Sequence, residues 1–399
     1  MKFNTVKLGE YLYIKGRIGW KGLKKKEYLE KSGFRIVNGE ALTENGIDWN
    51  KAGYISKERY DESPEIMLQQ DDILISKDGT IGKIGYVDSL DTPTTVASGI
   101  FVIRNQMPEI INTRFIYHFF NSKYFKDFII MRTEGSVIPH LYQKDFVDLD
   151  FPMPELRVQD KIVGILDVIN NKIKLNKSIN NNLLEQALTM FSTQFAALDR
   201  NGCIGDYCSV KSGFAFKSSW WTTNGVKVIK IGSINQDNLN LSECSYVDED
   251  KVDKAKDFKV IAGDLLIAMT GATIGKFAMV PYSSDTLLVN QRVGKFFLGN
   301  NPVEKLPFIY CTLKQPDVYY EIVNRGQGSA QPNISASDIM SISCVIPSKE
   351  AINKFNKTLQ PLFDLIISNQ RENQQLSTLR DSLLPKLMSG ELDVSDIDI

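Results

Sequence analysis

The chain has 399 residues, which is long enough for two or three domains with sizeable cores. Its hydrophobic fraction of 43% and charged fraction of 24% are typical of a globular protein, and no apolar run approaches the roughly 20 residues that a membrane-spanning helix needs. The net charge of −1 does not favour nucleic-acid binding, so that function requires basic residues to be segregated from acidic ones.

The five cysteines are odd in number and form no Cys-x-x-Cys pair. The first residues contain no apolar stretch of the kind that a signal peptide carries. We therefore expect a reduced, cytoplasmic protein that is not associated with a membrane.

Residues 1–154 are rich in short runs typical of β-strands, such as 72–76 and 99–104, separated by Gly, Asn, Asp and Pro. This pattern predicts a β-rich first domain. After Pro154 the periodicity changes, and residues 155–198 predict one long helix. Seven positions of this helix follow the alternating four-and-three spacing of a coiled-coil seam: Ile162, Leu166, Ile169, Ile173, Asn176, Asn180 and Leu183.

Residues 199–347 repeat the first domain at a spacing near 193 residues, well beyond the periods of solenoid repeats. The matched positions include an aromatic phrase, an Arg ahead of a Gly-Ser turn, and a glycine turn that ends in Lys. Phe115-Ile116-Tyr117, Arg132, Gly135-Ser136, Pro139 and Asp145 recur as Phe308-Ile309-Tyr310, Arg325, Gly328-Ser329, Pro332 and Asp338. Likewise, Asp72-Ile73-Leu74-Ile75 and Gly79-Thr80-Ile81-Gly82-Lys83 recur as Asp264-Leu265-Leu266-Ile267 and Gly271-Ala272-Thr273-Ile274-Gly275-Lys276.

Residues 348–393 predict a second long helix, and residues 394–399 form an acidic tail. The second seam consists of Phe355, Leu359, Leu362, Ile366, Asn369, Asn373 and Leu376, so both helices carry asparagine in the same two positions. A buried asparagine costs stability but favours the one register in which it finds a partner. We therefore expect the two helices to pair with each other. The alternative is that each helix packs separately on its own domain.

Several phrases of the chain resemble the specificity subunits of type I restriction-modification systems over nearly the whole length. They include Ser212-Gly213-Phe214-Ala215-Phe216-Lys217, the two Gly-x-Ile-Gly-Lys turns, Gln159-Asp160-Lys161-Ile162-Val163, and Leu383-Leu384-Pro385-Lys386-Leu387. The second helix departs from the pattern because it begins Ile352-Asn353-Lys354-Phe355, without a Gln-rich opening.

The resemblance implies an α+β fold with two pseudo-two-fold-related, β-rich target-recognition domains, separated by two long antiparallel helices that form a coiled coil. It implies that each domain reads one half of a split duplex DNA site. It also implies that the helices set the gap and dock two methyltransferase subunits, which nuclease-translocase subunits then join. S-adenosylmethionine, ATP and magnesium would be bound by those partners. A helix of about 37 residues is about 55 Å long, which bounds the separation at roughly 16 base pairs.

Features shared by both repeats should serve as scaffold or bind phosphate, whereas divergent loops should read bases, because the two halves would read different sequences. The shared DNA-contact candidates are Lys83, Arg132, Lys276 and Arg325. The divergent candidates are Arg17, Trp20, Lys21, Lys24, Lys25, Lys26, His140, Tyr142, Lys144, Lys217, Trp220, Trp221, Asn333 and Ser335. Surface salt bridges for the cations, and core packing for the tryptophans, remain open alternatives.

The sequence offers little for chemistry within this chain. The glycine turn at Gly271 has only three residues before Gly275-Lys276, so it does not match a phosphate-binding P-loop. Only two histidines occur, and Cys203 with Cys208 cannot complete a zinc site. We expect a non-catalytic subunit. The rival hypotheses are a coiled-coil scaffold that binds proteins only, and an enzyme with an unrecognised site.

Overall fold

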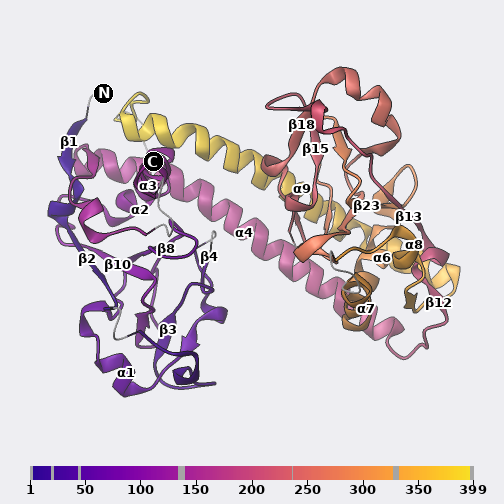
Figure 1. Ribbon diagram of the computed structural model, residues 1–399, viewed down its shortest axis with the longest axis horizontal. Helices are drawn as coiled ribbons and strands as arrows, with labels where there is room; N and C mark the ends of the chain where they lie inside the picture. The colour runs from indigo at the N-terminus through magenta and orange to yellow at the C-terminus, as the bar shows by residue number, and fades with distance from the viewer. Residues whose placement is uncertain are drawn as a thin grey trace. The chain divides into compact units, whose positions relative to one another are not determined.

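The computed structural model describes residues 3–18, 22–43, 46–133, 140–235, 237–326 and 332–395. The chain forms two compact units, Met1–Asn170 with Ser377–Ile399, and Asn171–Leu376 (Figure 1). Each unit contains one sequence repeat and a stretch of both long helices. Because the units divide the helices, the domain boundaries expected at 154 and 347 remain predictions.

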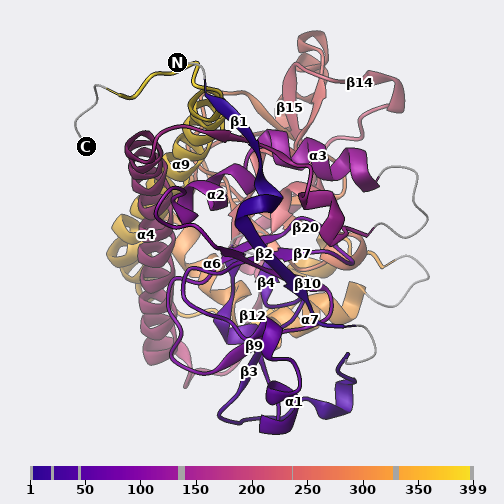
Figure 2. The same cartoon turned by 90° about the vertical axis from the view of Figure 1, so that its left-hand side faces the viewer.

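The first unit is built on a four-stranded antiparallel sheet in the order β2-β10-β7-β8, whose neighbouring strands β2 and β10 can be followed in Figure 2. The strands of this unit are β1 (Asn4–Lys7), β2 (Leu12–Gly16), β3 (Arg35–Val37), β4 (Leu42–Thr43), β5 (Gly46–Ile47), β6 (Gly53–Tyr54), β7 (Ile73–Ser76), β8 (Ile84–Tyr86), β9 (Thr94–Val96), β10 (Ile100–Asn105) and β11 (Asp150–Met153). Its short helices are α1 (Lys57–Asp61), α2 (Thr113–Phe120) and α3 (Lys123–Thr133). Beside the main sheet lie the pair β1-β11, the hairpin β4-β5 and the sheet β6-β3-β9, in which β3 and β9 are parallel.

The second unit repeats this plan with the sheet β13-β23-β20-β21 and the pair β12-β24. Its strands are β12 (Gly202–Cys203), β13 (Ser209–Ser212), β14 (Trp221–Thr222), β15 (Val226–Ile229), β16 (Ile234–Asn235), β17 (Asn238–Leu239), β18 (Ser245–Val247), β19 (Lys259–Val260), β20 (Leu265–Ala268), β21 (Phe277–Met279), β22 (Leu287–Val289), β23 (Val293–Phe297) and β24 (Ser343–Cys344). Its short helices are α5 (Ile204–Tyr207), α6 (Leu306–Leu313), α7 (Pro316–Gly326) and α8 (Ala336–Met340). The parallel pair β15-β22 corresponds to β3-β9, so the duplication seen in the sequence is also a duplication of topology.

The inner strands β7 and β20 are buried on both faces, which explains why each of their sequences is a continuous apolar run. In β7, Ile73 and Ile75 join the core beneath the helices, whereas Leu74 joins the core against the smaller sheet. In β20, Leu265 and Leu266 divide in the same way. A strand covered on both sides does not alternate between polar and apolar residues.

The repeated aspartate ahead of each central strand has a structural role. Asp72 is fully buried, pairs with Arg104 at 2.7 Å, and accepts the backbone N–H of Gln69. Asp264 pairs with Lys295 at 2.6 Å and accepts the backbone N–H of Ile261. Burial raises the pKa of both carboxyls, while the cationic partner opposes that rise. These residues therefore belong to the scaffold of each repeat.

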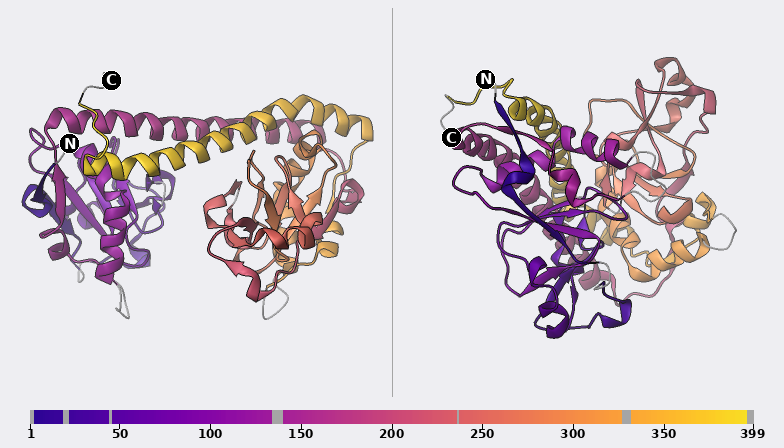
Figure 3. Two further views of the ribbon diagram at one scale, coloured as in Figure 1. Left: turned by 90° about the horizontal axis from the view of Figure 1, so that it is seen from above. Right: turned by 60° about the vertical axis from the view of Figure 1, so that its left-hand side comes forward.

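The two predicted long helices are present as α4 (Leu156–Phe195, 40 residues) and α9 (Lys349–Ser389, 41 residues). Within the first unit, the C-terminal end of α9 lies beside the start of α4 (Figure 3), and Leu384 and Leu387 share a core with Ile162 and Leu166. Within the second unit, Phe355 and Leu359 of α9 share a core with Leu184 and Ala187 of α4. The helices are therefore antiparallel neighbours in both units.

The asparagines of the two seams lie against each other. Asn176 donates to Asn373 at 3.0 Å, and Asn369 donates to Asn180 at 2.8 Å. In the repeat, Asn176 is equivalent to Asn369 and Asn180 to Asn373, so each asparagine pairs with the equivalent of the other one. This crossing pattern is that of a local two-fold axis through the helix pair. It is the pairing of polar layers that the spacing predicts.

The other seam positions are apolar and largely buried. Ile162, Leu166, Ile169, Ile173, Phe355, Leu359 and Ile366 are buried, whereas Leu183, Leu362 and Leu376 are half-buried. Phe363 and Ile367, which the spacing did not include, are fully buried. The buried face of α9 is wider than a two-helix seam because it also packs on the globular core of its unit.

Each long helix also holds the first turn of a short helix through a buried amide. Gln159 of α4 is fully buried, and its Oε1 accepts the backbone N–H of Asn112, the residue ahead of α2, at 2.8 Å. Asn356 of α9 accepts the N–H of Phe308 in α6 at 2.9 Å. Helix N-termini leave such N–H groups without intrahelical partners. Asn356 thus does for the second repeat what the glutamine at the opening of α4 does for the first.

Candidate nucleic-acid interface

The glycine turn of each repeat connects two strands of the main sheet. In the first repeat, Gly79 and Gly82 have φ values of +68° and +85°, a region that glycine enters without steric cost. The Ser76 hydroxyl accepts the backbone N–H of Lys83 at 2.9 Å and closes the turn. In the second repeat, Gly275 plays the part of Gly82, with a φ of +83°. These are tight turns that end in a lysine.

Each turn is seated against the helix that carries the repeated arginine. A Cβ atom at Gly82 would lie 2.9 Å from the Ile129 side chain of α3. In the second repeat, a Cβ atom at Gly326 of α7 would lie 2.8 Å from Ile274 of the turn. Turn and helix therefore approach closely in both repeats, because glycine stands at the point of contact.

The segment that follows the Gly-Ser motif returns to the same turn. The backbone N–H of Leu141 donates to the Lys77 carbonyl at 3.1 Å, and that of Ile334 donates to the Met269 carbonyl at 2.9 Å. The Gly-Ser motifs themselves, at 135–136 and 328–329, lie outside the described residues. The glycine turn, the helix that carries the repeated arginine and the segment after the Gly-Ser motif thus meet at one place in each repeat.

Around this place in the first repeat, polar and aromatic side chains are partly exposed. Arg132 is about half exposed, with its guanidinium 3.9 Å from Asp145. The His140 ring is bonded to Asp78 and packs edge-on against Tyr142, with ring centroids 4.5 Å apart. The Lys144 ammonium lies 5.4 Å from the Tyr142 ring. The Lys83 ammonium lies 3.4 Å from the Gly39 carbonyl and remains at the surface.

In the second repeat the equivalent residues are more engaged in holding the fold. Arg325 donates to the Asp338 carbonyl at 3.0 Å and to the Ser341 hydroxyl at 2.6 Å. Ser335 caps the N-terminus of α8 and bonds to Asp338, whose pKa these bonds lower. Asn333 is exposed and Lys276 is half-buried. Of the four, Asn333 and Lys276 are therefore the better placed for an external ligand.

The basic segment near the N-terminus divides into two parts. Lys24, Lys25 and Lys26 are exposed around a short 3-10 turn at Lys25–Glu27. Trp20 and Lys21 lie outside the described residues.

The sequence predicted that Arg17 contacts DNA, but its side chain is buried in the first unit. It is 1% exposed, and its guanidinium donates to the Val96 carbonyl at 3.1 Å and to the hydroxyls of Ser63 and Thr95. Burial lowers its pKa. We therefore remove Arg17 from the DNA-contact set, because its donors are used inside the first unit.

In the second repeat the divergent loop forms a cluster of lysines over tryptophans. Both Trp220 and Trp221 are half-buried on a small apolar core around Phe216. Four ammonium groups lie near their rings: Lys217, Lys251 and Lys254 at 5.8, 5.7 and 5.1 Å from Trp220, and Lys230 at 3.5 Å from Trp221. Core packing and cation–π contacts thus occur together here. Sequence reasoning missed Lys230, Lys251 and Lys254, which reach the tryptophans only through the fold.

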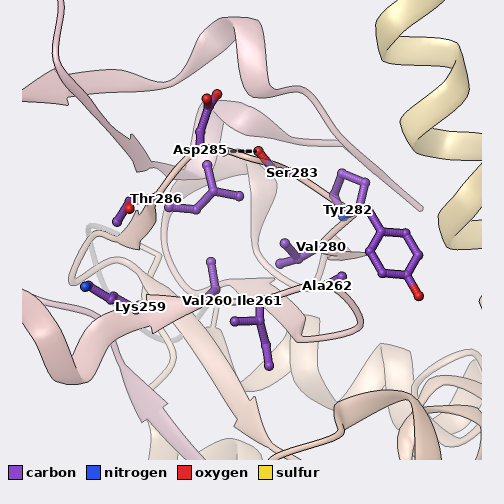
Figure 4. Close-up of a pocket in the computed structure, with 11 residues that line it drawn as sticks. Lys259, Val260, Ile261, Ala262, Val280, Tyr282, Ser283, Asp285 and Thr286 are labelled. Carbon is purple, nitrogen blue, oxygen red and sulfur yellow. Dashed lines mark hydrogen bonds between the residues drawn. The ribbon is translucent and has the colours of Figure 1, made fainter.

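A hollow of about 370 Å³ lies elsewhere in the second unit, at the edge strand β19 (Figure 4). Its lining is largely apolar, with Val260, Ile261, Val280 and Tyr282 around it. None of the predicted DNA-contact residues lines it. Among the described residues, no cluster of three His, Cys, Asp or Glu side chains is arranged to hold a metal ion. In the same part of the chain, no helix is both long and apolar enough to cross a bilayer.

Comparison with known proteins agrees with this architecture. Residues 2–185 and 200–378 match the family described as type I restriction modification DNA specificity domain. The chain is 22% identical over 361 residues to the type I restriction enzyme MjaVIII specificity subunit of Methanocaldococcus jannaschii, covering 84% of this chain and 82% of that protein. It is 27% identical over 344 residues to the MjaIX specificity subunit of the same organism, covering 79% and 76%.

Among solved structures, the type I restriction-modification S subunit from M. genitalium has a TM-score of 0.53 and 16% identity, covering 98% of this chain and 97% of that chain. At this identity the likeness is one of fold. The two family matches cover one repeat each, together with most of the following helix. The chain therefore belongs to the family of type I restriction-modification DNA specificity subunits, whose part in these systems is DNA target recognition.

Proposed function

We propose that this chain reads an asymmetric, two-part duplex DNA target, one half with each repeat, and brings methyltransferase and nuclease-translocase subunits to it. The observation that carries the proposal is the contrast within the duplication. The scaffold around the glycine turn is the same in both repeats, whereas the loops beside it differ in side chains. Two copies of one frame with different loops suit two different half-sequences.

The charge distribution supports backbone contacts despite the net charge of −1. Lys24, Lys25 and Lys26 are neighbouring exposed cations in the first repeat, and the lysines around Trp220 form a second basic cluster. Lysine binds phosphate as a point charge and carries no sequence information. We assign these lysines, with Lys83 and Lys276, to the DNA backbone.

Base reading needs side chains with directional donors, acceptors or flat apolar faces. Tyr142 and His140 lie beside the first turn, where His140 is bonded to Asp78, and the Asn333 backbone N–H donates to the Gly326 carbonyl of α7 beside the second turn. An asparagine amide can make two hydrogen bonds to adenine in the major groove. We therefore assign Asn333 and Tyr142 to base contacts in the second and first half-sites, respectively.

In this proposal the chain itself is non-catalytic and acts in the cytoplasm. We expect the partner subunits, and not this chain, to bind S-adenosylmethionine, ATP and magnesium. The paired helices α4 and α9 serve as the spacer between half-sites and as the platform for two methyltransferase subunits. The buried apolar seam within each unit and the bonded asparagines within the second unit support pairing of the two helices.

The test is to co-express the chain with its methyltransferase and map methylated motifs by long-read sequencing. We expect one motif with two unequal half-sequences and a fixed gap. Triple replacement of Lys24, Lys25 and Lys26 by Ala should weaken DNA binding and reduce the slope of log affinity against log salt by about one unit for each lost phosphate contact. Lys57→Ala is the control, since Lys57 is an exposed lysine paired with Asp61 in the same unit. A continuous palindromic motif, or a methyltransferase that modifies the same motif without this chain, would contradict the proposal.

A further inference from the structure

The hairpin β16-β17 of the second repeat turns at Asp237, whose backbone is in the left-handed region with a φ of +64°. Among the residues that the structure describes, only Asp71 and Asp237 adopt a positive φ without being glycine. Asp and Asn tolerate this conformation better than other side chains. The turn is therefore suited to present an aspartate at its tip.

Asp237 is bonded to two different helices. Its carboxylate accepts hydrogen bonds from the Tyr310 hydroxyl of α6 and from the ammonium of Lys314, the residue that follows α6. Its backbone carbonyl accepts the Gln370 side-chain amide of α9 at 3.1 Å. Its backbone N–H donates to the Phe277 carbonyl of β21 at 3.0 Å. One residue thus joins the main sheet, a short helix and a long helix of the same unit.

The residues that contact Asp237 favour one orientation of the hairpin on α6 and α9. Tyr310 is fully buried, and burial together with the nearby carboxylate raises its pKa, so the phenol remains a donor. Gln370 follows Asn369, the residue that bonds to Asn180 in the helix pair. A second bond, from Gln374 to the Leu239 carbonyl at 3.4 Å, joins the same hairpin to α9. The hairpin is therefore attached to α9 one residue from a polar layer of the helix pair.

We propose that Asp237 is a positioning residue, which holds the second recognition repeat at one orientation on α9 and so restricts the target to one gap length. This inference rests on the proposed function. Apolar contacts between the repeat and α9 are non-directional, whereas hydrogen bonds fix an angle. One base pair corresponds to about 3.4 Å of duplex, so a modest rotation of the repeat changes the gap that its loops can reach.

The hairpin is rigidly connected to the loops that would read DNA. Ile234 and Leu239 of the hairpin share a core with Ile229 of β15 and Val289 of β22. Those strands also carry the tryptophan cluster, because β15 pairs with β18 and β18 pairs with β14. The first repeat is attached to α4 through other residues, Gln159 and Asp167, the latter lying 2.7 Å from the His118 ring. In the second repeat, Asn356 of α9 still holds the start of α6 when Asp237 is changed. Changes at Asp237 therefore loosen the hairpin side of one repeat.

The experiment measures gap tolerance in cells that express the full chain with its methyltransferase. Asp237→Gly removes both carboxylate contacts and keeps the positive φ, whereas Gln370→Ala removes the contact from the side of α9. Asp237→Asn retains an acceptor for Tyr310 and tolerates the same backbone conformation. Asp285→Ala is the matched control, because it removes an Asp–Lys pair with Lys227, 2.6 Å long, in the same repeat without contact to α9. The readout is the methylated fraction at genomic sites whose gap is one base pair shorter or longer than the wild-type gap.

For Gln370→Ala we expect unchanged half-sequences and about a fivefold rise in methylation at the off-length sites, the factor expected from losing one hydrogen bond. For Asp237→Gly we expect a rise of at least this size, because the loss of two carboxylate contacts to Tyr310 and Lys314 frees the turn whose carbonyl accepts Gln370. Asp237→Asn should restore most of the wild-type profile, and Asp285→Ala should match the wild type. If Asp237→Gly yields no folded protein, Gln370→Ala decides. An unchanged gap profile in Gln370→Ala, or an altered half-sequence in its place, would overturn the inference. If the wild type itself shows no two-part motif, the proposed function fails instead.

Discussion

The polar layers of the helix pair allow a quantitative test, because their removal singly and together should have opposite consequences. In the single variant Asn369→Leu, the buried Oδ1 of Asn180 loses its donor, and in the single variant Asn180→Leu, the Asn369 amide loses its acceptor. An unsatisfied buried polar atom costs about 1–3 kcal/mol. For a unit of this size, about 2 kcal/mol corresponds to a fall of about 4–8 °C in the unfolding temperature.

The double substitution Asn180→Leu with Asn369→Leu removes both members of the pair and leaves an apolar layer. Such replacement is often neutral or stabilising, since neither group is left without a partner. We therefore expect the double variant to unfold at or above the wild-type temperature, and the cycle to show a coupling of about 1–3 kcal/mol. The assay is thermal unfolding of the purified full chain followed by circular dichroism. Single and double variants that are equally destabilised would refute the pairing as the source of the effect.

Three further predictions concern other parts of the fold. Arg17→Ala should lower the free energy of unfolding by about 1–3 kcal/mol, because it removes the guanidinium that donates to the Val96 carbonyl and two hydroxyls. The slope of log DNA affinity against log salt should stay unchanged. A reduced slope with unaltered stability would show that Arg17 contacts DNA. In the native chain, only Cys203 of the five thiols should react rapidly with a thiol reagent, because the other four are buried. Burial also raises the pKa of Cys208 and Cys344 to about 12, so little thiolate forms at these positions. A second rapidly reacting thiol would contradict the described core. Gly213→Ala should destabilise the second unit by about 3 kcal/mol, because the new Cβ would lie 2.3 Å from the Val289 carbonyl oxygen. Gly79→Ala should cost about 1–2 kcal/mol, because only its positive φ opposes the substitution. Equal falls in unfolding temperature for the two variants would contradict this difference.

The sequence predicted the features that depend on regular spacing. The two long helices, the duplicated strands and the matched asparagines all follow from regular spacing in the sequence, which does not depend on the conformation of the loops. The asparagine layers could be predicted because the repeat places the same residue at two equivalent seam positions, and antiparallel pairing then brings Asn176 to Asn373. Phe363 and Ile367 were missed because a seam pattern takes no account of a globular core on the same face.

The sequence predicted the candidate interface less completely, because that interface is formed by loops. The sequence does not distinguish a basic residue that faces solvent from one that, like Arg17, lies in the core. Lys230, Lys251 and Lys254 surround the tryptophans only after β15 and β18 have paired. Asp237 gave no signal, since its role depends on a left-handed backbone and on partners 73 and 133 residues away. The convergence of the glycine turn, the arginine helix and the segment after the Gly-Ser motif was not predicted, because recurrence in the same order shows that these motifs are shared and not that they lie together.

We propose that the paired helices set the gap between the two half-sites. This can be measured by inserting seven residues after Ile173 in α4 and seven before Leu376 in α9, positions that face each other in the register of Asn176 with Asn373. Seven helical residues add about 10 Å, or about three base pairs, and rotate the helix face by only about 20°. In methylation mapping of the assembled complex, we predict a motif with both half-sequences unchanged and a gap about three base pairs longer. A motif that keeps its original gap would contradict the claim.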